Sequence, residues 1–137
     1  MQPILTADEV TRVIAAGFHP APVRGVVEEV RPGFVRTRTP LDPVHMLRPG
    51  GVISGPALFT AADLAMYAVV LAHVGPQLMA VTSDLSIRFL RKGTPADIVA
   101  EASLLKLGRR LAIIDVRLSC GDDPALVAHA TGTYALP

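Results

Sequence analysis

The sequence predicts an α+β protein in which a curved antiparallel sheet wraps around one long apolar helix. Half of the 137 residues are hydrophobic, which is enough for a sizeable core in one domain, residues 1–137. Residues 57–72 are almost all apolar, whereas other segments alternate apolar and polar residues with the period of strands. Because nothing else in the chain can cover the apolar helix, six strands must wrap around it.

The N-terminal part predicts a short helix followed by a hairpin. Thr6 and Glu9 have the spacing of a capping box, and apolar residues at helical spacing follow, so we expect a helix over 7–17. The β-branched run 23–30 predicts a strand, residues 31–33 a turn, and residues 34–39 the partner strand.

A loop rich in proline and glycine, residues 39–51, leads into the long helix. Such a loop, placed before a buried element, commonly holds binding groups and is the first candidate for a site. Gly55-Pro56 predicts the start of the helix and Gly75-Pro76 its end. Apolar residues occur on every side of the helix, which predicts that it is covered all round.

The C-terminal part predicts four strands, over 81–89, 98–104, 111–119 and 125–136, with a tight turn at 106–109. In the first of these strands the alternation places Val81 and Leu85 on one face and Thr82 and Asp84 on the other.

Composition and charge exclude several classes of function. With 13 basic and 12 acidic residues the net charge is +1, and only 4% of the residues are aromatic, so neither nucleic acid nor a membrane is an expected partner. The single cysteine, Cys120, excludes an internal disulfide, and the scattered histidines give no metal signature. The N-terminus lacks the layout of a signal peptide, and the apolar stretch of about 16 residues is too short for a membrane span, which predicts a cytoplasmic protein.

Asp63 is the only formally charged side chain between Pro49 and Ser83. A carboxylate buried without a partner loses several kcal/mol of solvation, so an aspartate in these surroundings indicates a general base or a nucleophile. The alternative is an aspartate in a solvated gap or one that is hydrogen-bonded to a nearby hydroxyl such as Thr60.

The segment RPGGVISGPALFTAAD, residues 48–63, resembles the signature of the hotdog-fold acyl-CoA thioesterases, especially the phenylacetyl-CoA thioesterase-like branch. That signature is approximately N-P-x-G-x-x-H-G-G, followed by an acidic residue nine positions after the histidine. Pro49, Gly51, Gly55 and Asp63 match it. The element order and the later segment AVTSDLSIRFLRK extend the resemblance over roughly residues 20–136.

The resemblance implies a role for three residues and no cofactor beyond the coenzyme A of the substrate. Asp63 would be the nucleophile or general base at the thioester, and the backbone N–H of Gly55 would donate to the carbonyl oxygen as negative charge develops. Thr82 matches a position where such enzymes often carry a hydroxyl that orients the water. A thioester carbonyl is electrophilic, so these groups suffice without a metal.

Three positions depart from the signature, and the mildest is Pro56 at the last glycine, since proline suits a first helical turn. Ser54 stands where the histidine is expected, and it is either a helix cap or a catalytic hydroxyl. Arg48 stands where the asparagine is expected, and it either binds an acidic group of the substrate or pairs with Asp42 or solvent. His45 in the preceding loop either replaces the missing histidine in space or is an ordinary surface residue.

Further residues are candidates for substrate binding. Tyr67 lies one turn after Asp63, where it can close the acyl pocket, bond the carboxylate, or simply pack in the core. The clusters Arg91-Lys92 and Arg109-Arg110 can each hold the phosphates of coenzyme A, with solvated surface charge as the alternative.

The spacing along the helix predicts an oligomer. Gly55 and Asp63 are separated by about 12 Å at 1.5 Å per residue, too far to act on one carbonyl group within one chain. A site that uses both is most easily built across a homodimer, with strand 80–90 at an open sheet edge. The resemblance also implies edge-to-edge dimers with sites at the interface, and we expect a dimer of dimers.

The sequence therefore predicts an acyl-CoA thioesterase that releases a carboxylic acid and free coenzyme A. Because Ser54 and Arg48 depart from the signature, a non-catalytic or weakly catalytic acyl-CoA-binding protein is the alternative. A hydratase or dehydratase is a third possibility, but that chemistry normally relies on an active-site histidine paired with an acid.

Overall fold

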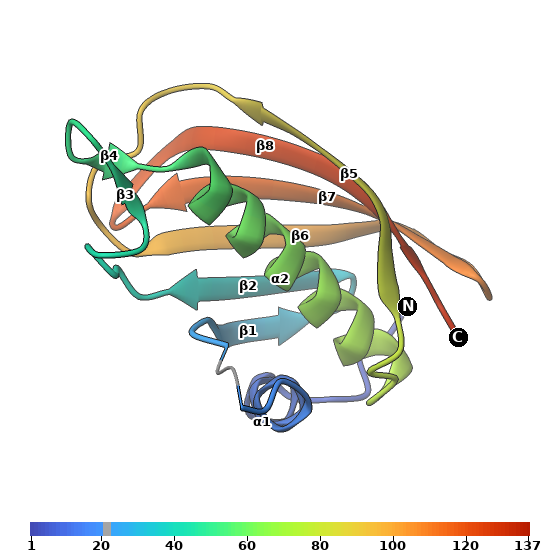
Figure 1. Cartoon of the computed structure of the whole chain (residues 1–137). Coiled ribbons are helices and arrows are strands. Elements are labelled where there is room, and N and C mark those ends of the chain that lie inside the picture. Colours follow the sequence, from blue (N-terminus) through green and yellow to red (C-terminus); the bar gives the residue numbers. More distant parts are fainter. Residues whose placement is uncertain (21–22) are drawn as a thin grey trace.

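A computed structural model describes residues 1–20 and 23–137 and shows a curved antiparallel sheet around one long helix (Figure 1). The sheet has six strands in the order β1-β2-β6-β7-β8-β5, and all neighbours are antiparallel. The predicted α+β class and its wrapped architecture are confirmed.

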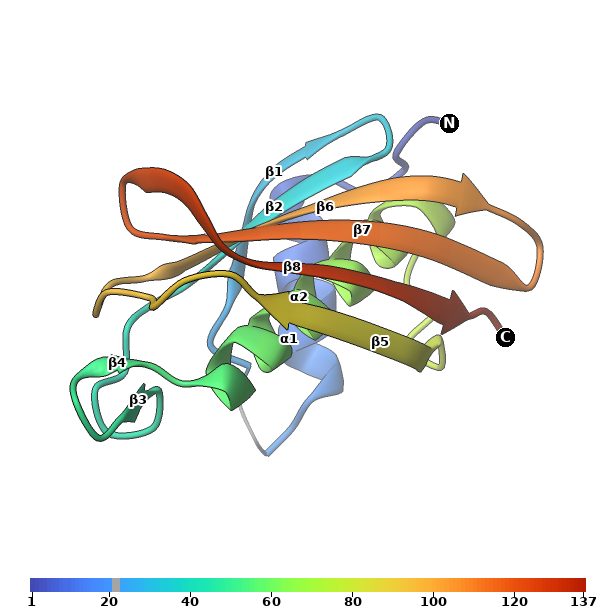
Figure 2. The ribbon, with the colours of Figure 1, turned by 90° about the horizontal axis from the view of Figure 1, so that it is seen from above.

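The helices are α1 (Ala7–Gly17) and α2 (Gly55–Val74), and the strands of the main sheet are β1 (Val26–Arg31), β2 (Phe34–Thr39), β5 (Val81–Phe89), β6 (Ile98–Leu107), β7 (Leu111–Cys120) and β8 (Asp123–Ala135). The Thr6–Glu9 capping box of α1 is present in full. In Figure 2, seen from above, β5 forms one edge of the sheet and the hairpin β1–β2 the other.

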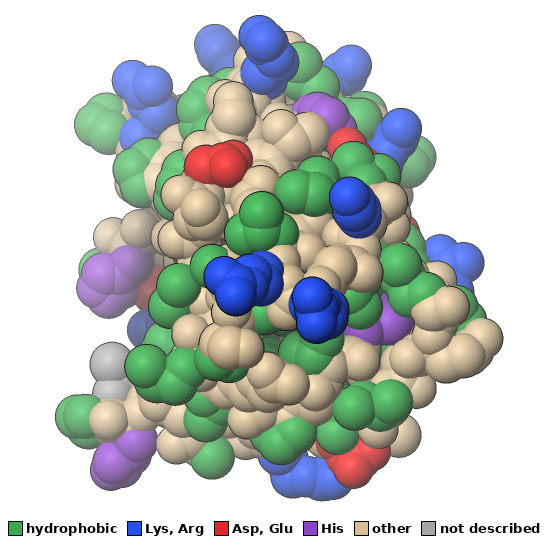
Figure 3. Space-filling view, turned by 90° about the vertical axis from the view of Figure 1, so that its right-hand side faces the viewer, with side chains coloured by type: hydrophobic (Ala, Val, Ile, Leu, Met, Phe, Trp, Pro, Cys, Tyr) green, Lys and Arg blue, Asp and Glu red, His purple; other side chains and the backbone are tan. Residues whose placement is uncertain are grey.

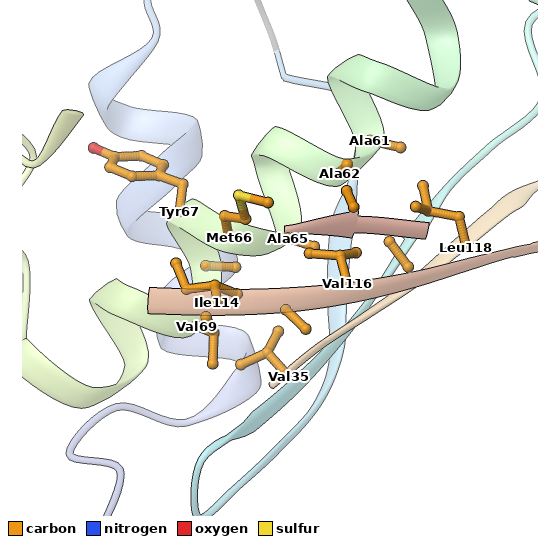
Figure 4. Packing of buried hydrophobic residues seen from close by; sticks show 14 of the residues in the cluster. Val35, Ala61, Ala62, Ala65, Met66, Tyr67, Val69, Ile114, Val116 and Leu118 are labelled. Atoms are coloured by element: carbon orange, nitrogen blue, oxygen red, sulfur yellow. The ribbon is translucent and has the colours of Figure 1, made fainter. Parts of the chain in front are cut away.

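The sheet-facing side of α2 is lined by small and flexible residues, which lets the helix lie close to the strands. Ala62, Ala65 and Met66 are fully buried there, and Figure 4 shows them directed at buried residues of the sheet such as Val116. Gly132 of β8 makes this approach possible, because a Cβ at that position would stand 2.9 Å from the Met66 side chain.

Several predicted boundaries were wrong, among them the start of the last strand, which begins at Asp123 rather than at 125. The first strand begins at Val26 rather than at 23, where the preceding residues have no strand pairing, and residues 21–22 lie outside the described residues. The loop 39–51 contains β3 (Leu47–Arg48), which pairs with β4 (Val52–Ile53) in a separate small ladder. β6 continues to Leu107, so the turn to β7 falls at 108–110.

A β-bulge in β5 overturns the predicted facing of its first residues. The pairing with β8 shifts between Thr82 and Asp84, so Ser83 is the extra residue. Thr82 therefore lies on the helix-facing side with Leu85, although strict alternation puts the two on opposite faces. The bulge is what directs the Thr82 hydroxyl towards α2.

The prediction that α2 is covered all round was also wrong. Its outer side carries exposed residues, including Phe59 at 41% exposure and Thr60. α2 has 20 residues and contains an 18-residue window with a mean hydropathy of 1.7, so length and composition do not distinguish it from a membrane span. Because 67% of its apolar window is buried inside the fold, we interpret it as a core helix.

Candidate active site

A cleft of about 880 Å³ runs along the outer side of α2. On one flank it is bordered by residues 23–25, Thr39 and the loop residues His45 and Met46. On the other flank it is bordered by residues that lead into β5 and by the end of β8. The polar side chains of the cleft include Asp63, Thr82 and Tyr134, which three different elements supply.

Asp63 is held by two hydroxyl groups that donate to the same carboxylate oxygen. Thr82 Oγ1 lies 2.7 Å and Tyr134 Oη 2.6 Å from Asp63 Oδ1, and the tyrosine hydroxyl also lies 3.2 Å from the Asp63 carbonyl. The predicted candidate partner Thr60 takes no part in these bonds. No described residue donates to Oδ2, so in a side chain that lines the cleft the lone pairs of this oxygen are free.

Tyr134 is the site residue that the sequence interpretation missed. It is 4% exposed and stands opposite Thr82 in the β5–β8 ladder. Burial and the neighbouring Asp63 carboxylate raise the pKa of the Tyr134 hydroxyl well above its usual value, so it stays protonated and donates. The alternation of the last strand could have shown that Tyr134 faces the core. It could not have shown the contact with Asp63, which lies 71 residues away in the chain.

Tyr67 closes the cleft and does not contact the carboxylate. Its hydroxyl donates to the Leu78 carbonyl at 2.9 Å, and its ring packs between those of Phe18 and Tyr134, with centroids 5.9 Å away on each side. Figure 4 shows Tyr67 on the side of α2 opposite to the sheet-facing residues. Of the three predicted roles, bonding to Asp63 is thereby excluded, while a pocket wall and a packed tyrosine remain.

The first turn of α2 has one free backbone donor. Ser54 caps the helix, since its Oγ accepts the Ala57 N–H at 3.2 Å and its carbonyl accepts the Leu58 N–H at 3.2 Å. Pro56 has no N–H. The N–H of Gly55 is therefore the donor in this turn that no described residue engages, and it lies at the positive end of the helix dipole.

A single chain does not bring Gly55 and Asp63 together. Gly55 lies against the ring of Phe89 at the end of β5, whereas Asp63 bonds Thr82 near its beginning. Gly55 is also absent from the residues that line the cleft.

Asp42 pairs with residues other than Arg48. Its carboxylate accepts from Arg24 Nη1 at 2.8 Å and from His45 Nδ1 at 2.7 Å. These bonds, with that of the His45 ring largest, hold the pKa of Asp42 below its usual value. Arg48 is exposed in β3 and has no ion pair among the described residues, which excludes the predicted Asp42 pairing.

The two basic clusters lie at opposite ends of the sheet. Arg91 and Lys92 follow β5 and stand near the start of α2, where the Ile53 N–H donates to the Gly93 carbonyl. Arg109 and Arg110 occupy the β6–β7 turn, which projects at the right of Figure 1. Figure 3 looks onto that end and shows lysine and arginine side chains scattered among hydrophobic ones.

The described residues contain no group of three or more His, Cys, Asp or Glu that could hold a metal ion.

The chain belongs to the thioesterase superfamily, because the model of that family matches residues 50–127. This match includes α2, the bulged strand β5 and most of the sheet, together with Asp63 and Thr82.

Individual relatives agree with this assignment. An assigned esterase of Saccharolobus solfataricus is 30% identical over 110 residues, which cover 80% of this chain and 71% of the relative. The structure of an assigned thioesterase from a Silicibacter species superposes with a TM-score of 0.89 at 36% identity, covering 100% of this chain and 95% of that one. A mutant of the phenylacetic acid degradation protein of Thermus thermophilus has a TM-score of 0.69 at 25% identity, covering 82% of this chain and 93% of that one. The resemblance to hotdog-fold thioesterases is thereby confirmed.

Proposed function

We propose that the protein hydrolyses the thioester of an acyl-CoA to a carboxylic acid and free coenzyme A. The observation that carries this proposal is the carboxylate of Asp63, which lies in a cleft with Oδ1 bonded by two hydroxyls and Oδ2 free. A carboxylate fixed in this way can act on a substrate without first reorganising its own surroundings.

Two routes are open to Oδ2. As a general base it takes a proton from water while the water oxygen attacks the carbonyl carbon; as a nucleophile it attacks that carbon itself and forms an anhydride that water then hydrolyses. In both routes the carbonyl electron pair moves onto oxygen, and a free backbone N–H such as that of Gly55 stabilises the oxyanion. The C–S bond then breaks and the thiol leaves.

We further propose that each site is shared between two chains, with Gly55 from one and Asp63 from the other. Support comes from the separation of the two residues along α2 and from β5, a nine-residue strand at the sheet edge of the described chain. Val81 and Phe89 of that strand are 54% and 55% exposed, as expected of residues that a second copy covers. A homodimer, paired again into a tetramer, is the proposed assembly, with the cytoplasm as its location.

The two basic clusters come from different chains in the proposed shared site. In a shared site, Arg91 and Lys92 lie at the Gly55 end of one chain, and Arg109 and Arg110 at the Thr82 end of the other. Either pair is suited to the phosphates of coenzyme A, and Arg48 beside the helix start to an anionic group of the substrate.

One observation favours the alternative, an acyl-CoA-binding protein with little or no activity. Ser54 is engaged as the helix cap, so the chain has no side chain free at the position where the family signature has histidine. The experiment that separates the two functions incubates the purified protein with short, long and aromatic acyl-CoA esters and records thiol release and binding in parallel. Thiol release that depends on Asp63 supports hydrolysis, whereas binding without release supports the alternative.

A further inference from the structure

His45 is the one histidine among the described residues that line the cleft. His73 is buried at the far end of α2, and His129 lies on the outer face of the sheet, paired with Asp115. Imidazole is the side chain that most readily exchanges protons near neutral pH, and the reaction steps given above assign it no task.

The ring of His45 is fixed from one side by a buried carboxylate. Asp42 is only 9% exposed, and its Oδ2 accepts from His45 Nδ1 while its Oδ1 accepts the Val44 N–H at 3.1 Å. The Asp42 carbonyl also accepts the backbone N–H groups of His45 and Met46, which closes the turn. With Nδ1 engaged, Nε2 is the ring nitrogen available to a ligand.

His45 also stands next to the start of α2. The carbonyl of the following residue, Met46, accepts the Ser54 N–H at 2.8 Å, so the turn that carries the imidazole is tied directly to the helix cap. Residues 56 and 57 of the first helical turn line the same cleft as His45. The imidazole and the free N–H of Gly55 therefore lie at the same end of α2, although Gly55 itself does not line the cleft, and in the proposed shared site both face Asp63 of the second chain.

We propose that His45, protonated and held by Asp42, is the general acid that protonates the leaving sulfur; this inference rests on the proposed thioesterase function. As the C–S bond breaks, its electron pair goes to sulfur, and the proton of Nε2 moves to that sulfur to give the free thiol. His45 is left neutral and regains a proton from solvent. Solvent in turn receives the proton that Asp63 took from the attacking water, so both groups return to their starting states.

Changing the leaving group of the substrate distinguishes a general acid from a residue with a structural role only. The same acyl group is supplied in two substrates, as its thioester with coenzyme A and as its thioester with 4-nitrothiophenol. The thiol of 4-nitrothiophenol is acidic, so it leaves as the thiolate without a proton donor. His45→Gln, at a side chain 72% exposed, should lower kcat about tenfold or more on the coenzyme A ester. On the aryl ester the loss should stay below about twofold.

Two further variants complete the experiment. His129→Gln removes a histidine that is also paired with an aspartate but lies outside the cleft, and it should leave both rates unchanged. Asp42→Asn should reproduce the selective loss, and the double variant with His45→Gln should lose no more than either alone.

Each outcome decides the matter. Equal losses on the two esters, or no loss on either, would overturn the role of His45 while the proposed function stands. If the unaltered protein hydrolyses neither ester, the proposed function fails and the role of His45 fails with it.

Discussion

Asp63 and Gly55 stand on the same helix, yet their surroundings are built in opposite ways. Around Asp63, α2, β5 and β8 converge, and the hydroxyls that fix its carboxylate come from residues 19 and 71 positions away. Around Gly55 the hydrogen bonds of the helix cap and of the turn tied to it are local and lie within residues 42–58, while the end of β5 only packs against them through Phe89.

The difference between these two regions is the reason for proposing that each chain carries two half-sites. The Asp63 region supplies a fixed negative charge whose two hydroxyl donors are engaged by Oδ1, whereas the Gly55 region supplies a free N–H at a helix start, and its one carboxylate, that of Asp42, is already bonded to Arg24 and His45. The rigid helix keeps Asp63 and Gly55 about 12 Å apart. In the proposed shared site each region is completed by the other from a second copy, and each can be altered separately.

The largest expected effect comes from removing the charge at Asp63. Asp63→Asn keeps an oxygen that accepts from Thr82 and Tyr134, so the fold and acyl-CoA binding should be retained while turnover falls about a hundredfold or more. Thiol release and ligand binding are measured on the same preparation. Asp84→Asn, on the exposed side of the same strand as Thr82, serves as the control and should be neutral. Near-normal turnover in Asp63→Asn would remove the carboxylate from the mechanism.

The hydroxyl groups should each have a smaller effect than the charge that they hold. Tyr134→Phe or Thr82→Val leaves one donor on Oδ1. We expect each to lower kcat about tenfold with little change in KM, since the loss of one hydrogen bond to a charged group costs at least about 1.5 kcal/mol and the second donor remains. Steady-state kinetics of both variants and of the double variant measure this. A change confined to KM would show that the hydroxyls bind substrate and do not position Asp63.

At the Gly55 region, replacing the cap separates stability from activity. Ser54→His and Ser54→Ala both remove the bond to the Ala57 N–H, so each should lower the free energy of unfolding by about 1 kcal/mol. Only the histidine variant restores the histidine of the family signature, and only it should gain activity towards common acyl-CoA esters. If neither variant gains activity, this loop has been adapted to another task.

The smallest effect on activity is expected far from both regions, at His73. Burial lowers the pKa of this imidazole from 6.5, and its neutral form accepts the Gly33 N–H at 2.9 Å. Because the unfolded chain binds the proton more readily, the stabilisation by neutral His73 is present above about pH 6.5 and is lost as pH falls below it. Denaturant unfolding at pH 7.5 and 5.5 should show this loss, and His73→Gln should reduce it. If the free energy of unfolding depended on pH equally in the variant and in the unaltered protein, His73 would not be the cause of the loss.

The sequence predicted the elements whose signals are local. The capping box at Thr6, the helix start at Gly55-Pro56 and the edge position of the strand after α2 are all confirmed. The small ladder β3–β4 was missed because strands of two residues are too short to show a period.

Interactions between distant segments were beyond the reach of the sequence patterns. The bulge at Ser83 depends on the register with β8, and only that register brings Thr82 and Tyr134 to the same carboxylate oxygen. The prediction that α2 is covered all round failed on its outer side. The sequence pattern shows which residues are apolar, but it does not show whether the same chain covers them.

The central claim is that Gly55 and Asp63 of different chains form one site, and mixed dimers test it most directly. One chain carries Asp63→Asn, and the other carries Gly55→Pro, which removes the N–H; Gly55→Ala, which keeps it, is the control for added bulk near Phe89. Each homodimer should be nearly inactive, while the purified heterodimer regains one intact site of two and about half of the normal activity. Folded heterodimers without activity, or a fully active monomer, would contradict the shared site.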